Sequence, residues 1–175
     1  MKQGTGISML IACAWLVAAP AIAADAAMTG MQFMREAQDR VAIEDLMWRY
    51  ARALDTNNAD AYAAVYTEDG QFGTGDKATK GRAALHKMVA DLKQARIDRE
   101  AKGEPKRPDT LHMETNHSIT FKDADHATYN AYWVTMFTSL GPAPARVGAV
   151  GRSIDEVVRV NGQWLIKLRN VTPTD

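Results

Sequence analysis

An aspartate, Asp55, and a histidine, His112, are the residues of this sequence best suited to proton transfer. Asp55 ends a stretch of helical periodicity, where a carboxylate faces the negative end of the helix dipole and loses about 0.3–1 kcal/mol. It follows Trp48 and Ala51 by seven and four residues, so it borders the apolar stripe of that helix. Asp55 is therefore either a turn-forming residue with its side chain in water or a carboxylate with a compensating partner.

His112 lies at the start of a predicted strand, and its neighbours on one strand face are polar. Two-residue alternation places these residues on the face of His112: Thr110, Glu114, Asn116 and Ser118. Such a face either contacts solvent or lines a polar cavity. His117 falls on the opposite face, so it cannot share a metal ion with His112, and no three ligands show the spacing of a zinc site.

The motifs of cofactor-dependent chemistry are missing from the sequence. It holds no Gly-rich phosphate loop, no Ser nucleophile elbow and no dinucleotide fingerprint. We therefore expect neither a metal nor an organic cofactor.

The elements that must position Asp55 and His112 follow from periodicity. Apolar residues at three- and four-residue spacing predict a long helix over 31–54, a short second helix that Asn58 caps, and a third helix over 82–99. A brief strand near Gln71 and Phe72 separates the second helix from the third, and residues 100–109 form a charged loop. Alternation then predicts strands over 111–121, 128–138, 147–160 and 163–171, and Asn161-Gly162 predicts a hairpin turn between the last two.

Three helices followed by an antiparallel meander predict an α+β fold. The helices must cover one face of a strongly curved, mostly antiparallel sheet, which gives a cone-shaped barrel. A cavity is then expected between the first helix and the concave face, and small-molecule sites favour such places.

The N-terminus has the pattern of a cleaved export signal. Lys2 precedes an apolar run that ends at Ala21-Ile22-Ala23, and about 15 apolar residues are too few for a membrane-spanning helix. A lipoprotein processing site at Cys13 would come too early in that run. We predict a signal peptide over 1–23, a lead-in over 24–37 and one domain over 38–173, in a periplasmic or secreted protein.

Composition restricts the partners of the mature chain. Without residues 1–23 it has 20 basic and 21 acidic residues, a net charge of −1 that argues against nucleic acid and anionic membranes. Cys13 leaves with the signal, so neither thiol chemistry nor a disulfide is expected.

Several short motifs, in this order, resemble the SnoaL-like branch of the nuclear transport factor 2-like superfamily. They are Tyr50-x4-Asp55, Tyr66-x2-Asp69-Gly70, Gly81-Arg82, His112-Met113-x2-Asn116, Gly151-Arg152 and Asn161-Gly162-x-Trp164. The resemblance covers about residues 38–171. It is strongest to the cofactor-free lyases of that branch, which include bile-acid dehydratase, scytalone dehydratase and hexachlorocyclohexane dehydrochlorinase.

The resemblance implies roles for individual residues. His112 matches the catalytic base, Asp55 its carboxylate partner, and Tyr50 a hydrogen-bond donor that the bile-acid enzyme has five residues before the Asp. Arg169 matches an Arg of the dehydrochlorinase, although alternation on its strand equally allows Arg169 to face solvent. The basic residue of the bile-acid enzyme has no counterpart, because Pro173 occupies its position.

Together these residues predict elimination or isomerisation next to a carbonyl of a small cyclic substrate. His112 would remove the carbon-bound proton, Asp55 would orient the ring, and Tyr50 with Asn116 would bind the developing oxyanion. Aromatic residues are candidates either for the substrate pocket or for plain core: Trp48, Tyr62, Phe72, Tyr132 and Trp133. The alternatives are a non-catalytic binding module and, with less support, a structural subunit, because a fold does not fix a function. The resemblance also implies a homo-oligomer, a dimer or trimer.

Overall fold

The computed structural model describes residues 19–173, and the chain divides into two units, residues 1–37 and 38–175, each described by itself. The described residues of the first unit are helical and belong to α1 (Ala19–Asp55). Most of the predicted signal, residues 1–23, lies outside the described residues, so export stays a prediction. No helix within residues 19–173 has the length and apolar character needed to span a membrane.

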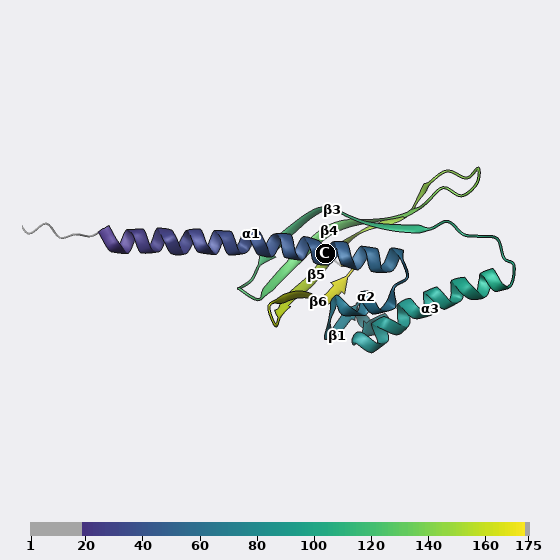
Figure 1. Cartoon of the computed structure of the whole chain (residues 1–175), viewed down its shortest axis with the longest axis horizontal. Coiled ribbons are helices and arrows are strands. Elements are labelled where there is room, and N and C mark those ends of the chain that lie inside the picture. The colour runs from purple at the N-terminus through teal and green to yellow at the C-terminus, as the bar shows by residue number, and fades with distance from the viewer. Residues whose placement is uncertain (1–18, 174–175) are drawn as a thin grey trace, which may run out of the picture. The chain divides into compact units, whose positions relative to one another are not determined.

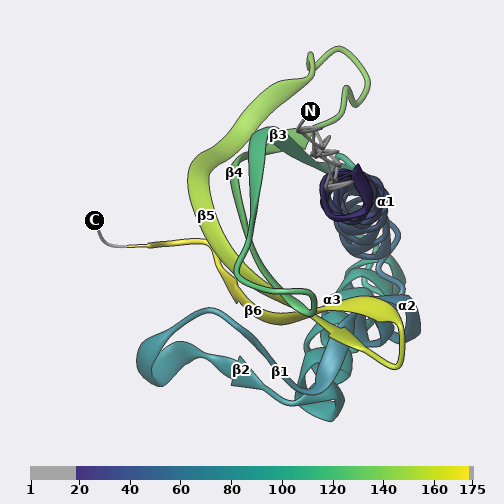
Figure 2. The ribbon, with the colours of Figure 1, turned by 90° about the vertical axis from the view of Figure 1, so that its left-hand side faces the viewer.

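The second unit contains a curved six-stranded sheet (Figures 1 and 2). Its strands are β1 (Tyr66–Phe72), β2 (Thr79–Lys80), β3 (Thr110–Phe121), β4 (His126–Phe137), β5 (Arg146–Val160) and β6 (Gln163–Asn170), in the order β2-β1-β6-β5-β4-β3. Strands β3 to β6 form the predicted antiparallel meander, and β1 joins β6 in parallel. The α+β class and the cone-like curved sheet are confirmed; the sheet is mixed and does not close.

Two of the predicted local signals are confirmed in detail. The side-chain oxygen of Asn58 accepts a 3.0 Å hydrogen bond from the amide of Ala61 and so caps α2 (Ala59–Ala64). Asn161 and Gly162 both have positive φ, 50° and 80°, as a tight hairpin turn requires. A third helix, α3 (Arg82–Ala101), follows β2 and begins where it was expected.

The core lies between α1 and the concave face of the sheet, which curves around this helix in Figure 2. From α1, Ile43, Leu46 and Tyr50 are buried at helical spacing, and Val157 and Ile166 meet them from the sheet. Each such apolar side chain contributes roughly 1.5–3 kcal/mol when fully buried. This packing fixes the end of α1, where Asp55 lies, against the sheet.

A β-bulge interrupts β3 and corrects the predicted faces. The register with β4 shifts between Thr115 and Ser118, and Asn116 has a φ of 48°. One extra residue reverses the alternation beyond it. His117 therefore faces α1, where it binds Glu44, as His112 binds Asp55; Asn116 and Ser118, which flank it, are exposed. The prediction of opposite faces for the two histidines was wrong.

A second bulge has the same effect in β6. Ile166 pairs with Val157 and Leu168 pairs with Glu156, so Lys167 is an extra residue. Arg169 consequently faces inward, the same way as Trp164 and Ile166, and its side chain is 1% exposed. The solvent-facing alternative for Arg169 was wrong.

Candidate active site

Asp55 and His112 form a hydrogen-bonded pair between the last residue of α1 and the start of β3. Oδ1 of Asp55 lies 2.9 Å from Nδ1 of His112 and also accepts a 2.9 Å hydrogen bond from the backbone N–H of His112. The Asp55 side chain is 8% exposed and that of His112 is 30% exposed. Two hydrogen bonds at one oxygen compensate the carboxylate for its position at the negative end of the helix.

The pairing determines which nitrogen of His112 can act as a base. A carboxylate accepts hydrogen bonds only, so the neutral ring carries its proton on Nδ1 and donates it to Asp55. The lone pair is then on Nε2. The imidazolium that forms when Nε2 takes a proton is stabilised by the Asp55 charge. This is the arrangement of a general base held in one tautomer.

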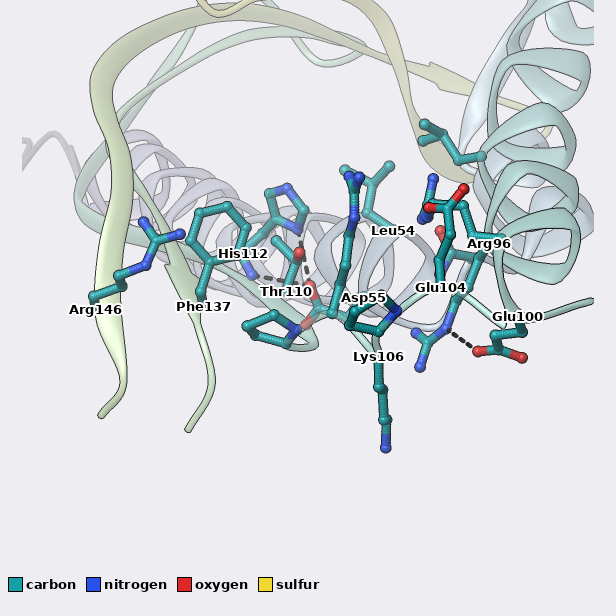
Figure 3. Close-up of a pocket in the computed structure, with 16 residues that line it drawn as sticks. Leu54, Asp55, Arg96, Glu100, Glu104, Lys106, Thr110, His112, Phe137 and Arg146 are labelled. Carbon is teal, nitrogen blue, oxygen red and sulfur yellow. Dashed lines mark hydrogen bonds and ion pairs between the residues drawn. The ribbon is translucent and has the colours of Figure 1, made fainter. Parts of the chain in front are cut away.

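His112 and Asp55 lie on the wall of a pocket of about 580 Å³ (Figure 3). Leu54 contributes from α1, Phe137 from β4 and Arg146 from β5, while the end of α3 and the loop after it form the other side. Two other pockets, of about 410 and 640 Å³, contain neither Asp55 nor His112. The dyad therefore borders a space large enough for a small molecule.

A buried charge cluster lies on the same sheet face as His112. Arg169 forms ion pairs with Asp155 and Glu114, and Ser153 lies 3.3 Å from one of its nitrogens. Its guanidinium also lies 4.5 Å from the centre of the Tyr50 ring. None of these residues lines the pocket, so the cluster belongs to the interior of the cone.

One arginine cannot neutralise two carboxylates, and the pKa values reflect this. Burial raises the pKa of Glu114 to about 7, against the opposing attraction of Arg169. Burial also raises the pKa of Asp155. Although burial disfavours the charge of Arg169, the surrounding Tyr50, Asp155 and Glu114 raise its pKa. Arg169 is therefore charged, and Glu114 exchanges a proton near neutral pH.

Tyr50 belongs to a buried tyrosine cluster. Its ring centre lies 5.5 Å from that of Tyr62 and 6.4 Å from that of Tyr66, and the hydroxyls of Tyr62 and Tyr66 are 3.0 Å apart. Burial raises the pKa of Tyr50 despite the nearby Arg169 charge. Tyr50 is thus a neutral phenol that can donate a hydrogen bond, but it does not line the pocket.

The remaining predicted binding residues are not gathered around the dyad. Trp48 is 66% exposed on α1, Tyr132 is 54% exposed on β4, and Asn116 is exposed at the bulge of β3. Tyr62 is fully buried, and Phe72 packs against the core from β1. None of the five lines the pocket with His112.

Trp133 lies on the inner face, but its indole is hydrogen-bonded to backbone carbonyls. Its indole Nε1–H lies 3.2 Å from the carbonyl oxygens of both Arg152 and Val171. A Cβ added to Gly151 would come within 2.3 Å of the indole ring, so this glycine makes room for Trp133. Trp133 therefore stays in the interior and does not line the pocket.

Sequence reasoning missed several residues that line the pocket or the interior. Phe137 falls on the inner face of β4 and could have been found by extending the alternation through Trp133. Arg146 precedes the predicted limits of its strand, so no signal pointed to it. Glu114 was placed on the correct face, but its partnership with Arg169 depends on a bulge in a different strand.

Within residues 19–173, no three His, Cys, Asp or Glu residues lie close enough to hold a metal ion.

Comparison with known proteins agrees with this fold. A scytalone dehydratase-like protein of Novosphingobium aromaticivorans is 24% identical, with a TM-score of 0.64, over 82% of this chain and 89% of that one. LinA, the hexachlorocyclohexane dehydrochlorinase, is 17% identical, with a TM-score of 0.63, over 81% and 90%. Rv3472 of Mycobacterium tuberculosis, a protein of unknown function, is 24% identical, with a TM-score of 0.61, over 77% and 75%.

No curated protein matches the chain. Likenesses at these identities show the fold alone. The model of the SnoaL-like domain, by contrast, matches residues 35–170 directly, which is most of the chain. This chain therefore belongs to the SnoaL-like family of the nuclear transport factor 2-like superfamily.

Proposed function

We propose that this protein is a cofactor-free lyase or isomerase that removes a carbon-bound proton from a small cyclic apolar substrate. One observation carries the proposal: Nδ1 of His112 lies 2.9 Å from Oδ1 of Asp55, and both residues line a pocket of about 580 Å³. The SnoaL-like fold supports it, because the structural neighbours include a dehydratase-like protein and a dehydrochlorinase.

The proposed reaction begins at Nε2 of His112. This nitrogen takes a proton from the carbon next to a carbonyl; the electron pair of the broken C–H bond forms a C=C bond, and the π pair of the carbonyl moves to its oxygen, which gives an enolate. In elimination, the enolate re-forms the carbonyl and expels a hydroxyl group from the next carbon, which leaves as water with the proton from His112. In isomerisation, a conjugated enolate takes that proton back from His112 at a different carbon. General-base help of this kind contributes about 10²–10⁴ in rate.

Asp55 acts through His112 in this proposal. Its carboxylate keeps the ring proton on Nδ1 and stabilises the imidazolium that forms during proton transfer. Tyr50 and Arg169 do not line the pocket, so the proposal gives them no contact with the substrate. The role of oxyanion donor for Tyr50, with Asn116 as helper, stays a prediction.

The proposal is tested by hydrogen–deuterium exchange at carbon. A panel of cyclic ketones with acidic α-protons or a β-hydroxyl group is incubated with the protein in deuterated water and followed by NMR. At least one compound should lose its α-proton signal with wild-type protein. His112→Ala and Asp55→Asn should each slow that exchange by about 10² or more.

A matched control comes from the same strand. His117 also pairs with a carboxylate of α1, Glu44, at 3.1 Å, but it does not line the pocket. His117→Ala should therefore keep wild-type exchange, and circular dichroism should show that all three variants are folded. Wild-type exchange in His112→Ala would contradict the proposal. Tight binding of panel compounds without any exchange would instead support a non-catalytic binding protein.

A further inference from the structure

The pocket beside His112 carries more positive than negative side chains. Its cationic residues are Arg96, Arg99, Lys106, Arg107 and Arg146. Its carboxylates are Asp55, Glu100 and Glu104. The whole sequence, by contrast, has equal numbers of basic and acidic residues. Positive charge is therefore concentrated at this pocket, where low-dielectric walls strengthen its field.

Most of the negative charge at the pocket is already engaged. Asp55 binds His112, and Glu100 pairs with Arg96 at 3.4 Å. Arg96 has a second partner in Asp109, at 3.0 Å. Among the described residues, no ion pair joins Arg107 or Arg146 to a carboxylate. Among the described residues Arg99 and Lys106 have no such ion pair either, so a ligand can reach these four cations of the pocket without breaking an ion pair.

Arg146 has a geometry that suits an anion. Its guanidinium lies over the ring of Phe137, 4.5 Å from the ring centre. Stacking of this kind uses the flat face of the guanidinium and leaves its in-plane N–H donors free for a bidentate oxyanion. Phe137 of β4 pairs with Arg146 of β5 on one side and with Thr110 of β3 on the other. Thr110 is two residues before His112 on β3. Figure 3 shows Phe137 between Arg146 and His112.

Apolar groups complete the pocket. Leu54 and Phe137 lie beside the dyad, and Leu92 of α3 and Pro105 and Pro108 of the loop line the pocket as well. Arg99 lies in the last turn of α3, where a cation is favourable without any ligand, and Lys106 extends away from the dyad in Figure 3. The argument therefore depends on Arg146 and Arg107.

We propose that the substrate is an organic anion whose apolar body contacts Leu54 and Phe137 and whose carboxylate, sulfonate or phosphate group binds Arg146 and Arg107. This inference rests on the proposed function and adds the class of the substrate to it. The anionic group lies apart from the reacting carbon, so it positions the substrate and takes no part in proton transfer. Charge-assisted hydrogen bonds of this kind provide orientation as well as affinity.

A pair of fluorescent probes tests the anion site without knowledge of the substrate. 8-Anilinonaphthalene-1-sulfonate and N-phenyl-1-naphthylamine share one apolar body and differ by the sulfonate. Wild-type protein should bind the sulfonate at least about tenfold more tightly than the neutral probe. The double variant Arg107→Gln/Arg146→Gln should raise the Kd of the sulfonate about tenfold and that of the neutral probe less than about twofold.

The control variant is Lys122→Gln, an exposed cation that follows the far end of β3 from His112 and does not line the pocket, and it should change neither Kd. Thermal unfolding checks that the variants are folded. Equal binding of the two probes by wild-type protein would overturn the proposal. Absence of binding by either probe, or an unchanged sulfonate Kd in the double variant, would overturn it as well.

The two proposals can fail separately. If the sulfonate preference is present and depends on the arginines but no compound exchanges deuterium, the anion site stands and the assignment of His112 as a base falls. If exchange depends on His112 but the probes bind equally, the base stands and the anion site falls.

Discussion

Glu114 and Asp155 share one buried arginine, and this makes the interior of the cone sensitive to pH. With both carboxyls ionised the cluster carries one net negative charge, and with Glu114 protonated it is neutral. The pKa of Glu114, about 7, lies close to physiological pH. An isolated buried charge is costly, so the charge state of this one residue affects the stability of the whole domain.

We predict that Glu114 lowers the stability of the protein as the pH rises. Its pKa increases from 4.5 in the unfolded chain to about 7 in the folded one. Between these values the unfolded chain binds fewer protons, so the free energy of unfolding falls as the pH rises through 7. The free energy of unfolding of Glu114→Gln, minus that of wild type, should increase by about 1–3 kcal/mol from pH 5 to pH 8. Urea unfolding at the two pH values measures this difference.

Glu156→Gln provides the control, because Glu156 neighbours Asp155 on β5 but is exposed. The free energy of unfolding of Glu156→Gln should differ from that of wild type by the same amount at pH 5 and at pH 8. A constant difference between Glu114→Gln and wild type from pH 5 to pH 8 would show that Glu114 does not titrate in this range.

At the scale of elements, two of the β-bulges in the sheet decide whether His117 and Arg169 face the interior. The bulge of β3 turns His117 toward α1, and the bulge of β6 buries Arg169 opposite Asp155. Without the second bulge Arg169 would face outward, and Asp155 and Glu114 would lose their partner. Each bulge thus determines which side chains of its strand face the interior.

The bulge of β3 can be tested at Asn116, whose φ of 48° is strained for most residues but easy for glycine. Asn116→Gly should change the free energy of unfolding by less than about 0.5 kcal/mol, whereas Asn116→Val should lower it by about 1–2 kcal/mol. Chemical denaturation measures both. Ser118→Val, at an exposed strand position nearby, should have little effect, and a similar loss there would contradict the assignment of strain to residue 116.

The sequence predicted the helices, the meander, the cap at Asn58 and the turn at Asn161-Gly162, because each depends on neighbouring residues. The pairing of Asp55 with His112 was implied only by the resemblance to a family. The faces of His117 and Arg169 were not predictable by alternation, since one extra residue in a strand reverses it and leaves no compositional signal. Trp48 was a candidate for the pocket, but its side chain is 66% exposed on α1 and does not line the pocket.

At the scale of the whole molecule, the outer face of the sheet remains apolar. Leu111 and Met113 of β3, Tyr132 of β4 and Val147 and Val150 of β5 are all at least 41% exposed. Cross-strand pairing places these residues next to one another, on the face opposite to His112. Exposed apolar groups gathered in this way are typical of an interface.

We predict that this outer face forms a homo-oligomer. Val150 is 66% exposed and pairs with Val134. Val150→Asp should shift the protein toward the monomer in light scattering after size-exclusion chromatography, because a charge would be buried in the interface. Lys80→Gln, outside this face, is the control. A wild-type monomer at micromolar concentration would contradict the prediction.

The predicted signal peptide over residues 1–23 can be tested by finding where the mature chain begins. If residues 1–23 are a signal, the protein recovered from the periplasm of an expressing bacterium should begin at Ala24, as intact mass spectrometry can show. Ala23→Arg removes the small residue that precedes the cleavage site and should leave the signal attached. An uncleaved wild-type chain would contradict the prediction.

Helix α1 and strand β3 are matched in length between two contacts. Glu44 and Asp55 are eleven residues apart, which corresponds to about three turns and about 16 Å, so both reach one side of α1. Their partners His117 and His112 are five strand residues apart, again about 16 Å. Gain or loss of one residue between Glu44 and Asp55 would rotate one carboxylate by about 100° and break a pair. Insertions and deletions are therefore not tolerated in this part of α1.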